Sequence, residues 1–259
     1  MAYIQKIGRT LIATLSAIGS VSLFAGRAIL TCLYPPFYPR LILRQLVSVG
    51  YFSLPVVGLT ALFTGMVLAL QSYTGFSRFN AESAVATVVV LSITRELAPV
   101  LAGLMVAGRI GAAMAAEIGT MRVTEQIDAL TTLSTDPFHY LITPRIIAGI
   151  LTLPILVLVA DVIGVFGGFL VGVYYLDFNA ASYIIQTFDY LEAFDVISGL
   201  IKAALFGFIV VLMGCYHGYR SRGGAQGVGR ATTNAVVSAS VLILCFNYLL
   251  TALFFGISP

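Results

Sequence analysis

Charged side chains are scarce in this sequence, since Asp, Glu, Lys and Arg make up 10% of its 259 residues. A typical soluble domain carries about 25%. Hydrophobic residues make up 59%, and the mean hydropathy is +0.99. Water therefore cannot be the main solvent of the chain. Apolar runs of about 20 residues cross a bilayer as helices, and several such runs occur here. We predict an all-α polytopic membrane protein that forms a single domain over residues 1–259.

Lysine occurs only at Lys6 and Lys202. The phosphate-binding motif GxxxxGK[ST] places its lysine after a glycine, whereas these two follow Gln5 and Ile201. No HExxH metal motif occurs either. The chain is therefore expected to lack its own ATP site and to be no enzyme. If it moves cargo, ATP hydrolysis is expected in a partner chain.

Histidine and cysteine are also rare. His139 and His217 fall in expected loops, which argues against an intramembrane serine–histidine protease. The three cysteines show no CxxC or metal-ligand spacing and fit buried apolar positions, so no disulfide framework is indicated. We expect no metal, no cofactor in this chain and no nucleic-acid partner.

Five apolar stretches predict membrane spans, and together they form a bundle over residues 46–256. The second has about 34 residues, or ~50 Å at 1.5 Å each, which exceeds a hydrocarbon core of ~30 Å. It must tilt, kink near Pro99 or protrude. The spans are residues 46–74, 84–117, 146–175, 196–216 and 233–256.

The N-terminal region, residues 1–40, admits three interpretations: a signal peptide, a true span, or a helix in the plane of the membrane interface. Residues 10–26 are diluted by Thr, Ser and Gly, and basic residues flank them on both sides. Crossing the membrane would put one basic cluster on the wrong side. We favour the interfacial helix.

Basic residues set the expected orientation. With five spans and a cytoplasmic N-terminus, Arg78 is the only basic residue in the outer loops, as the positive-inside rule predicts. The C-terminus is then outside. The expected cytoplasmic segments contain Lys6, Arg9, Arg27, Arg40, Arg44, Arg122, Arg145, Arg220, Arg222 and Arg230.

Four charges fall well inside the expected spans, namely Arg95, Glu96, Asp161 and Lys202, whereas Arg109 and Glu117 lie at the cytoplasmic end of the second span. Each needs a partner or a wet cavity, because a charge at the bilayer centre costs at least ~2.5–3.5 kcal/mol on insertion scales. One interpretation is internal pairing that holds the bundle together. We favour the other, a polar pocket in which Arg95 and Lys202 contact an anionic headgroup. That role fails if both cations are sealed against protein carboxylates with no hollow beside them.

The segment 117–141 is long and of mixed polarity, as a short amphipathic helix would be. We predict that it is the socket for a partner that supplies energy, and the alternative is a solvated connecting loop. Its apolar residues Ile118, Met121, Ile127, Leu130 and Leu133 alternate with Glu117, Arg122, Glu125 and Asp128.

Two stretches carry a family resemblance. The run RELAPVLAGLMVAGRIGAAMAAEIGTMRVTEQIDAL (residues 95–130) is followed by DPFHYLITPR (136–145). Together they resemble the MlaE permease family, the membrane subunits of MCE-type phospholipid ABC transporters. The spacing Glu117-Ile-Gly119-x-Met121-x-x-x-Glu125-Gln126 is the family's hallmark. The later GRATTNAVVSAS (229–240) is also similar, so the resemblance extends over nearly the whole chain from about residue 20.

The resemblance implies an interfacial N-terminal helix plus five spans, assembled as a homodimer in the cell inner membrane. The implied partners are a cytoplasmic ABC ATPase, a STAS-domain protein and a periplasmic MCE-domain hexamer. The implied cargo is glycerophospholipid carried between the inner and outer membranes, which maintains outer-membrane lipid asymmetry.

By position, the resemblance also implies roles for individual residues. Arg95, Glu96 and Lys202 would line the lipid cavity, with Glu82 near its periplasmic mouth. ATPase coupling would involve Glu117, Gly119, Met121, Arg122, Glu125, Gln126 and Asp128. Two other functions stay open: an ion-gradient-driven secondary transporter with Asp161, Glu96 and Lys202 as a proton relay, and a non-transporting membrane scaffold.

Overall fold

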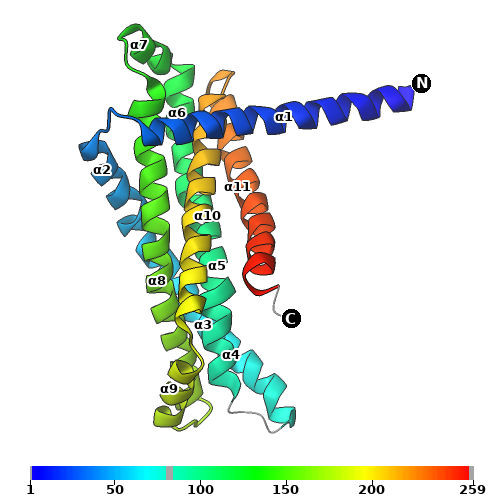
Figure 1. Cartoon of the computed structure of the whole chain (residues 1–259), viewed down its shortest axis with the longest axis vertical. Helices are drawn as coiled ribbons and strands as arrows, with labels where there is room; N and C mark the ends of the chain where they lie inside the picture. The colour runs from blue at the N-terminus through cyan, green and yellow to red at the C-terminus, as the bar shows by residue number, and fades with distance from the viewer. Residues whose placement is uncertain (1, 80–83, 257–259) are drawn as a thin grey trace.

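The computed structural model describes residues 2–79 and 84–256, and within that part of the chain every regular element is a helix (Figure 1). The predicted all-α class is confirmed. The α-helices are α1 (Ala2–Leu33), α2 (Pro39–Val49), α3 (Leu54–Phe76), α4 (Ala84–Ser92), α5 (Ala98–Val106), α6 (Ala112–Val123), α7 (Gln126–Thr132), α8 (Thr143–Tyr174), α9 (Ala180–Asp189), α10 (Ala193–Tyr219) and α11 (Gly224–Phe255). Short 3-10 or π segments join several of them: η1 (Tyr51–Ser53), η2 (Ser77–Phe79), η3 (Ile93–Leu97), η4 (Ala107–Gly111) and η5 (Phe138–Ile142).

Each of the five expected spans corresponds to a continuous helical run that is long and apolar enough to cross a membrane. The second run has 40 residues and ends at Val123 rather than at residue 117. At 1.5 Å per residue it is ~60 Å long, so it projects beyond a ~30 Å core. Polar residues can continue a helix once it has left the hydrocarbon, which explains the later end. The runs are Pro39–Phe76, Ala84–Val123, Phe138–Tyr174, Ala193–Tyr219 and Gly224–Phe255.

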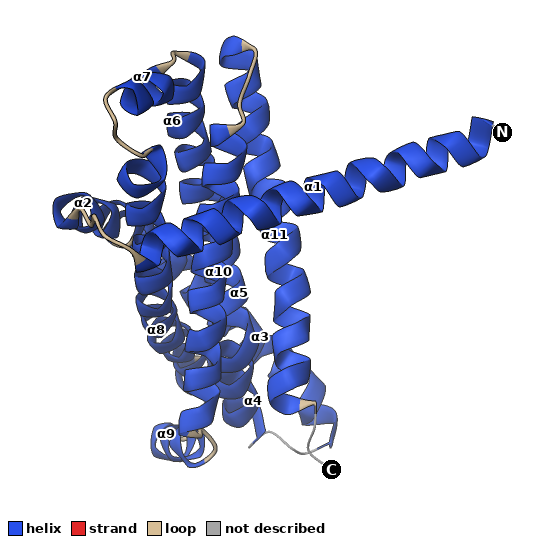
Figure 2. Cartoon of the chain, turned by 45° about the horizontal axis from the view of Figure 1, so that its top comes forward, coloured by secondary structure: helices blue, strands red, loops and turns tan. Residues whose placement is uncertain are grey.

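Helix α1 lies across the bundle instead of along it, and its N-terminal half points away from the other helices (Figures 1 and 2). By length and composition, Leu11–Leu33 could also cross a membrane. Its C-terminal half packs on the bundle, where the ring of Phe24 lies 5.1 Å from Phe138 and 5.5 Å from Tyr216. An interfacial helix would cross the other spans in this direction, and the placement of α1 in the membrane interface stays a prediction.

The two ends of the bundle differ. One end carries α7, together with the end of α6 and the starts of α8 and α11; we call it the α7 end. The opposite end carries α9, which returns along α8 after a turn, and we call it the α9 end (Figure 1). Asn179 caps α9, because its side chain accepts a hydrogen bond from the backbone N–H of Ser182 at 3.1 Å.

Helices α3 and α8 approach until their backbones touch. A methyl group on Gly65 would overlap the backbone carbonyl of Gly164, and one on Gly167 would overlap that of Leu62. Ala160, Gly164, Gly168 and Gly172 on α8 are all buried, so this ladder of small residues forms a packing seam. Such contacts replace the hydrophobic driving force that helices lack in lipid.

We expect Gly65→Ala to destabilise the protein by about 1–3 kcal/mol, because the methyl group has no space beside Gly164. Gly75→Ala is the matched control in the same helix, since no atom lies within 4 Å of its Cβ position. A helical Gly→Ala change in free space is neutral or stabilising by about 1 kcal/mol. Thermal unfolding of the detergent-solubilised chain measures both, and equal melting temperatures would contradict the seam.

Candidate functional site

The intramembrane charges gather where the second helical run changes its pitch. Pro99 has no backbone N–H, so the carbonyl of Arg95, four residues earlier, has no α-helical donor. The run adopts π geometry over η3 (Ile93–Leu97), and the N–H of Ala98 donates to the carbonyl of Ile93 instead. Lys202 on α10 donates to the freed carbonyl of Arg95 at 2.9 Å. A proline thus exposes a backbone acceptor at membrane depth, and a lysine satisfies it.

Lys202 is completely buried and uses all three of its donors. Besides the Arg95 carbonyl, its Nζ contacts Glu96 Oε1 at 2.7 Å and Thr251 Oγ1 at 2.8 Å. Glu96 also accepts from the Thr251 hydroxyl at 2.8 Å and, through Oε2, from Asn247 Nδ2 at 2.8 Å. The network joins α10 and α11 to η3, which lies about 100 residues or more before the residues that contact it.

Arg95 has a different environment. Its Nε donates to Asp195 Oδ1 at 2.7 Å, and its guanidinium carbon lies 4.6 Å from the centre of the Phe255 ring. Asp195 is buried, and its Oδ2 accepts from the N–H of Glu192, which forms the capping box of α10. The Arg95 side chain remains 34% exposed. Its two Nη groups have no hydrogen-bond partner in the described part of the chain, so they are open to an anion.

The structure therefore separates the two predicted cations. Lys202 is sealed against Glu96, as the internal-pairing interpretation describes, whereas Arg95 and Glu96 are each about one-third exposed. Asp195, Asn247 and Thr251 belong to the same cluster, and sequence reasoning did not single them out. Glu82 lies outside the described residues.

Gly199 lets α10 come close enough for these contacts. A Cβ at this position would lie 2.5 Å from the backbone oxygen of Thr94 in η3. Any larger residue would push α10 away from η3. Lys202, one turn further along α10, would then lose its reach to the Arg95 carbonyl.

The segment predicted as a socket forms a turn and a short helix at the α7 end. Glu125 has a φ of 60°, in the left-handed region, and turns the chain from α6 into α7. Gln126 and Asp128 are exposed on α7, whereas Ile127 is fully buried and anchors it. Leu133, expected on the apolar side, is 75% exposed where α7 ends.

The neighbouring charges hold this turn in place. Arg122 donates to Asp128 Oδ1 at 2.6 Å and lies over the Tyr219 ring, with 5.7 Å from its guanidinium carbon to the ring centre. Gly119 is buried against Ser221 and Val228, where a Cβ would be 3.4 Å and 3.5 Å away. The structure thus brings the predicted coupling residues to one end of the molecule, in a defined conformation.

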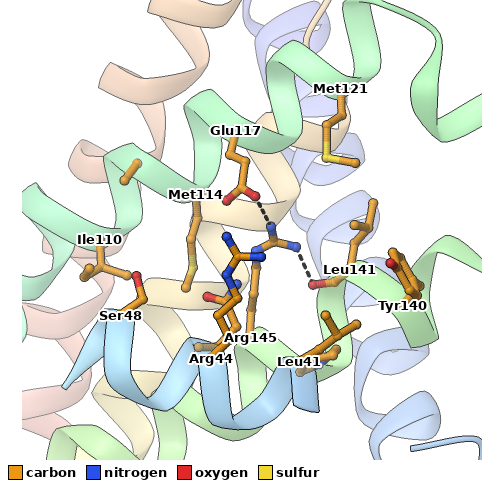
Figure 3. A pocket seen from close by; sticks show the side chains of 13 residues that line it. Leu41, Arg44, Ser48, Ile110, Met114, Glu117, Met121, Tyr140, Leu141 and Arg145 are labelled. Atoms are coloured by element: carbon orange, nitrogen blue, oxygen red, sulfur yellow. Dashed lines mark hydrogen bonds and ion pairs between the residues drawn. The ribbon is translucent and has the colours of Figure 1, made fainter. Parts of the chain in front are cut away.

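A polar pocket of about 350 Å³ opens beside this segment, between α2, α6, η5 and α8 (Figure 3). Two of the predicted coupling residues, Glu117 and Met121, line it. Glu117 accepts from Arg145 Nη2 at 2.9 Å, and Arg145 Nη1 donates to the Leu141 carbonyl at 2.6 Å. Arg44 also lines the pocket. The sequence analysis used Arg44 and Arg145 only to predict the orientation of the chain in the membrane, and it did not predict that they line one pocket.

Asp161 lies apart from the charge cluster. It lines an apolar groove of about 450 Å³ with Thr94 of η3 and Tyr183 of α9. Neither oxygen of its carboxyl group has a hydrogen-bond partner in the described residues. Burial raises the pKa of Tyr183 to about 12, so its hydroxyl stays protonated. No hydrogen bond among the described residues joins Asp161 to Glu96 or Lys202, as a proton relay through all three would require.

Comparison with known proteins places this arrangement in context. The family described as Permease MlaE matches residues 42–253. A probable ABC transporter permease protein of Rickettsia felis is 63% identical over 253 residues, covering 98% of each chain. The intermembrane phospholipid transport system permease protein MlaE of Haemophilus influenzae is 35% identical over 256 residues, again covering 98% of each. The chloroplastic protein TRIGALACTOSYLDIACYLGLYCEROL 1 of Arabidopsis thaliana is 39% identical over 91% of this chain and 67% of its own.

The buried network makes a prediction about stability. Lys202→Met removes one member of a buried pair and leaves Glu96 and the Arg95 carbonyl without their donor. Breaking such a pair costs about 3–5 kcal/mol, and we expect the lower end because Glu96 is partly exposed. Thermal unfolding in detergent measures the loss.

The double variant Lys202→Met/Glu96→Gln supplies the control. A neutral amide needs no counter-charge, so the second change should restore part of the lost stability, and the coupling is read from the double-mutant cycle. Strictly additive effects, or a stable Lys202→Met single variant, would contradict the network.

Proposed function

The chain belongs to the MlaE permease family, and from that premise we propose that it moves glycerophospholipids between the inner and outer membranes as the membrane subunit of an ABC transporter. Its transport would maintain the lipid asymmetry of the outer membrane. The observation that carries this proposal is the side chain of Arg95, which is one-third exposed and is held by a buried network inside an otherwise apolar span.

Arg95 is suited to hold a phosphate group. Its Nε is fixed by Asp195, so the guanidinium is oriented before any ligand arrives. The two Nη groups then present parallel donors, which match two phosphate oxygens. Glu96, about one-third exposed on the next residue, offers a carboxylate to an amine headgroup. We assign Lys202 the supporting role of holding Glu96 and η3 in place.

Energy would reach this cluster through the second helical run. Continuous helix runs from Glu96 to Val123, two residues before Glu125, and these 27 residues at 1.5 Å each span ~40 Å. A partner that moves α7 would therefore act on η3 through one continuous helical rod. This rod departs from α-helical geometry at the π segments η3 and η4. The partner we propose is an ATP-binding ABC ATPase, since the chain has no Walker A motif of its own.

Charge supports a cytoplasmic α7 end. Arg44, Arg122, Arg145 and Arg220 all lie there, whereas Arg78 is at the α9 end. The positive-inside rule then puts the α7 end in the cytoplasm and the C-terminus in the periplasm of an inner-membrane protein. Helix α1 would lie in the cytoplasmic interface.

A second copy of the chain would complete the cavity. Helix α11 supplies Asn247 and Thr251 to the cluster on one face and exposes an apolar stripe beside it, which contains Val237, Val241, Leu244 and Tyr248. A homodimer that buried this stripe would enclose the two Arg95 side chains. Family membership leads us to propose two further partners, a STAS-domain protein and a periplasmic MCE-domain hexamer, with Glu82 near the latter.

The proposed cycle is mechanical. ATP binding closes the ATPase pair, the α7 segments move, and the two permease copies open or squeeze the central cavity. The lipid head then exchanges its contacts with Arg95 for water or for the MCE tunnel. Because a ligand shifts an equilibrium only by its differential affinity, Arg95 must hold the head less well in one state. Transport that stopped with the proton gradient and ignored ATP would instead support an ion-driven transporter.

We predict that Arg95→Glu lowers the amount of phospholipid bound to the purified complex by about tenfold, the value of one charge-assisted hydrogen bond. Lipid mass spectrometry measures the bound lipid, and size-exclusion chromatography checks assembly. Arg95→Lys keeps the charge opposite Asp195 but loses the planar pair of donors, so we expect an intermediate loss in a folded protein. Arg78→Glu, exposed at the α9 end, is the control. Normal lipid content in Arg95→Glu would refute the headgroup role.

The socket prediction uses two acidic residues that both have left-handed backbone. Glu125→Asn at the α7 end should weaken co-purification of the ATPase by about tenfold, as expected for a residue at the centre of an interface. Asparagine tolerates this backbone, so the turn is preserved. Asp177→Asn, with a φ of 57° near the α9 end, is the matched control and should retain the ATPase. Equal retention in both variants would show that α7 is only a connecting loop.

A further inference from the structure

The polar pocket at the α7 end is covered by helix α2, whose polar side chains face the pocket and whose apolar side chains face outward. Helix α2 turns Arg44, Gln45 and Ser48 toward the pocket. On its other side Leu43 and Val47 are 62% and 54% exposed, as on a helix that faces lipid. The pocket is thus a polar hollow reached from the edge of the bilayer.

The charges in this hollow do not balance. Two arginines, Arg44 and Arg145, face one glutamate, Glu117, so one positive charge is in excess. The Arg145 side chain is 4% exposed, and its Nε has no hydrogen-bond partner in the described residues. Arg44 has no ion-pair partner within residues 2–79 and 84–256, and its side chain lines the same pocket as that of Arg145 (Figure 3). Two guanidinium groups that line one pocket and keep open donors attract an anion rather than each other.

We propose that this pocket binds the headgroup of an anionic phospholipid from the leaflet on the α7 side. The phosphate would lie between Arg44 and Arg145, with the Gln45 amide and the Ser48 hydroxyl as further donors. The acyl chains would leave along the apolar side of α2, past Leu43 and Val47. The volume of about 350 Å³ suits a headgroup rather than a whole lipid.

This site is separate from the proposed transport cavity. Glu117 is 21 residues beyond Glu96 on the same helical run, or ~32 Å at 1.5 Å each. A bound phosphate would share Arg145 with Glu117 and thereby contact α6 two turns before α7. The inference rests on the proposed function only in that the α7 end faces the cytoplasmic leaflet.

The absence of tryptophan makes a direct test possible. Tyr140 lines the pocket, so Tyr140→Trp introduces the only indole of the chain at its edge. The full chain carrying this change is titrated with phosphatidylglycerol, and separately with phosphatidylcholine, each brominated on its acyl chains to quench the indole. We expect about a tenfold preference for the anionic lipid, equivalent to one charge-assisted contact.

Two arginines of α2 then serve as variant and control. Arg44→Gln should abolish the preference, whereas Arg40→Gln, exposed on the same helix and outside the pocket lining, should keep it. An equal loss in both would mean diffuse surface attraction and overturn the site. Complete displacement of the lipid by inorganic phosphate would assign the pocket to a soluble anion and also overturn the proposal. Neither Arg95 nor the ATPase enters this assay, so its failure would leave the transport proposal standing.

Discussion

The arrangement depends on one backbone carbonyl at membrane depth. Pro99 deprives the carbonyl of Arg95 of its helical donor, and in lipid no water is available to replace it. Lys202 supplies the missing hydrogen bond at 2.9 Å and brings its charge with it. The charge needs Glu96, and Glu96 in turn takes Asn247 and Thr251 of α11. A single proline thus leads to a network that holds three separate spans together.

The same contacts fix the backbone and the Nε atom of Arg95 and leave its two Nη groups for a ligand. The carbonyl of Arg95 is fixed by Lys202, and its Nε is fixed by Asp195, so the residue is held at both ends. Its two Nη groups have no hydrogen-bond partner among the described residues. Rigid support and open donors are the two properties that a binding group needs, because orientation is then not lost on binding. The same division occurs in the polar pocket at the α7 end, where Arg145 is held by Glu117 and Leu141 while Arg44 has no ion-pair partner among the described residues.

One helical rod contributes residues to both of these sites. It runs without a break in helix from Ala84 to Val123, with π geometry at η3 and η4. Close packing against α10, which Gly199 permits, keeps the rod in contact with the rest of the bundle. If a partner moves α7, as we propose, the movement would reach the charge cluster through this backbone rather than through flexible side chains.

Hydropathy determined the membrane class and the five long helical runs of the bundle, and the four-residue spacing of Gly and Ala predicted the small-residue seam of α8, since both follow from the pattern within single helices. The sequence also identified the unusual charges Arg95, Glu96 and Lys202, because any charge in an apolar run is conspicuous. It did not show that Asp195 pairs with Arg95 and Glu96 pairs with Lys202, so that Lys202 is sealed and Arg95 stays partly exposed. Nor did it show that Arg44 and Arg145, about 100 positions apart, line one pocket. Pairing between distant residues depends on how the helices pack, and only the tertiary structure decides it.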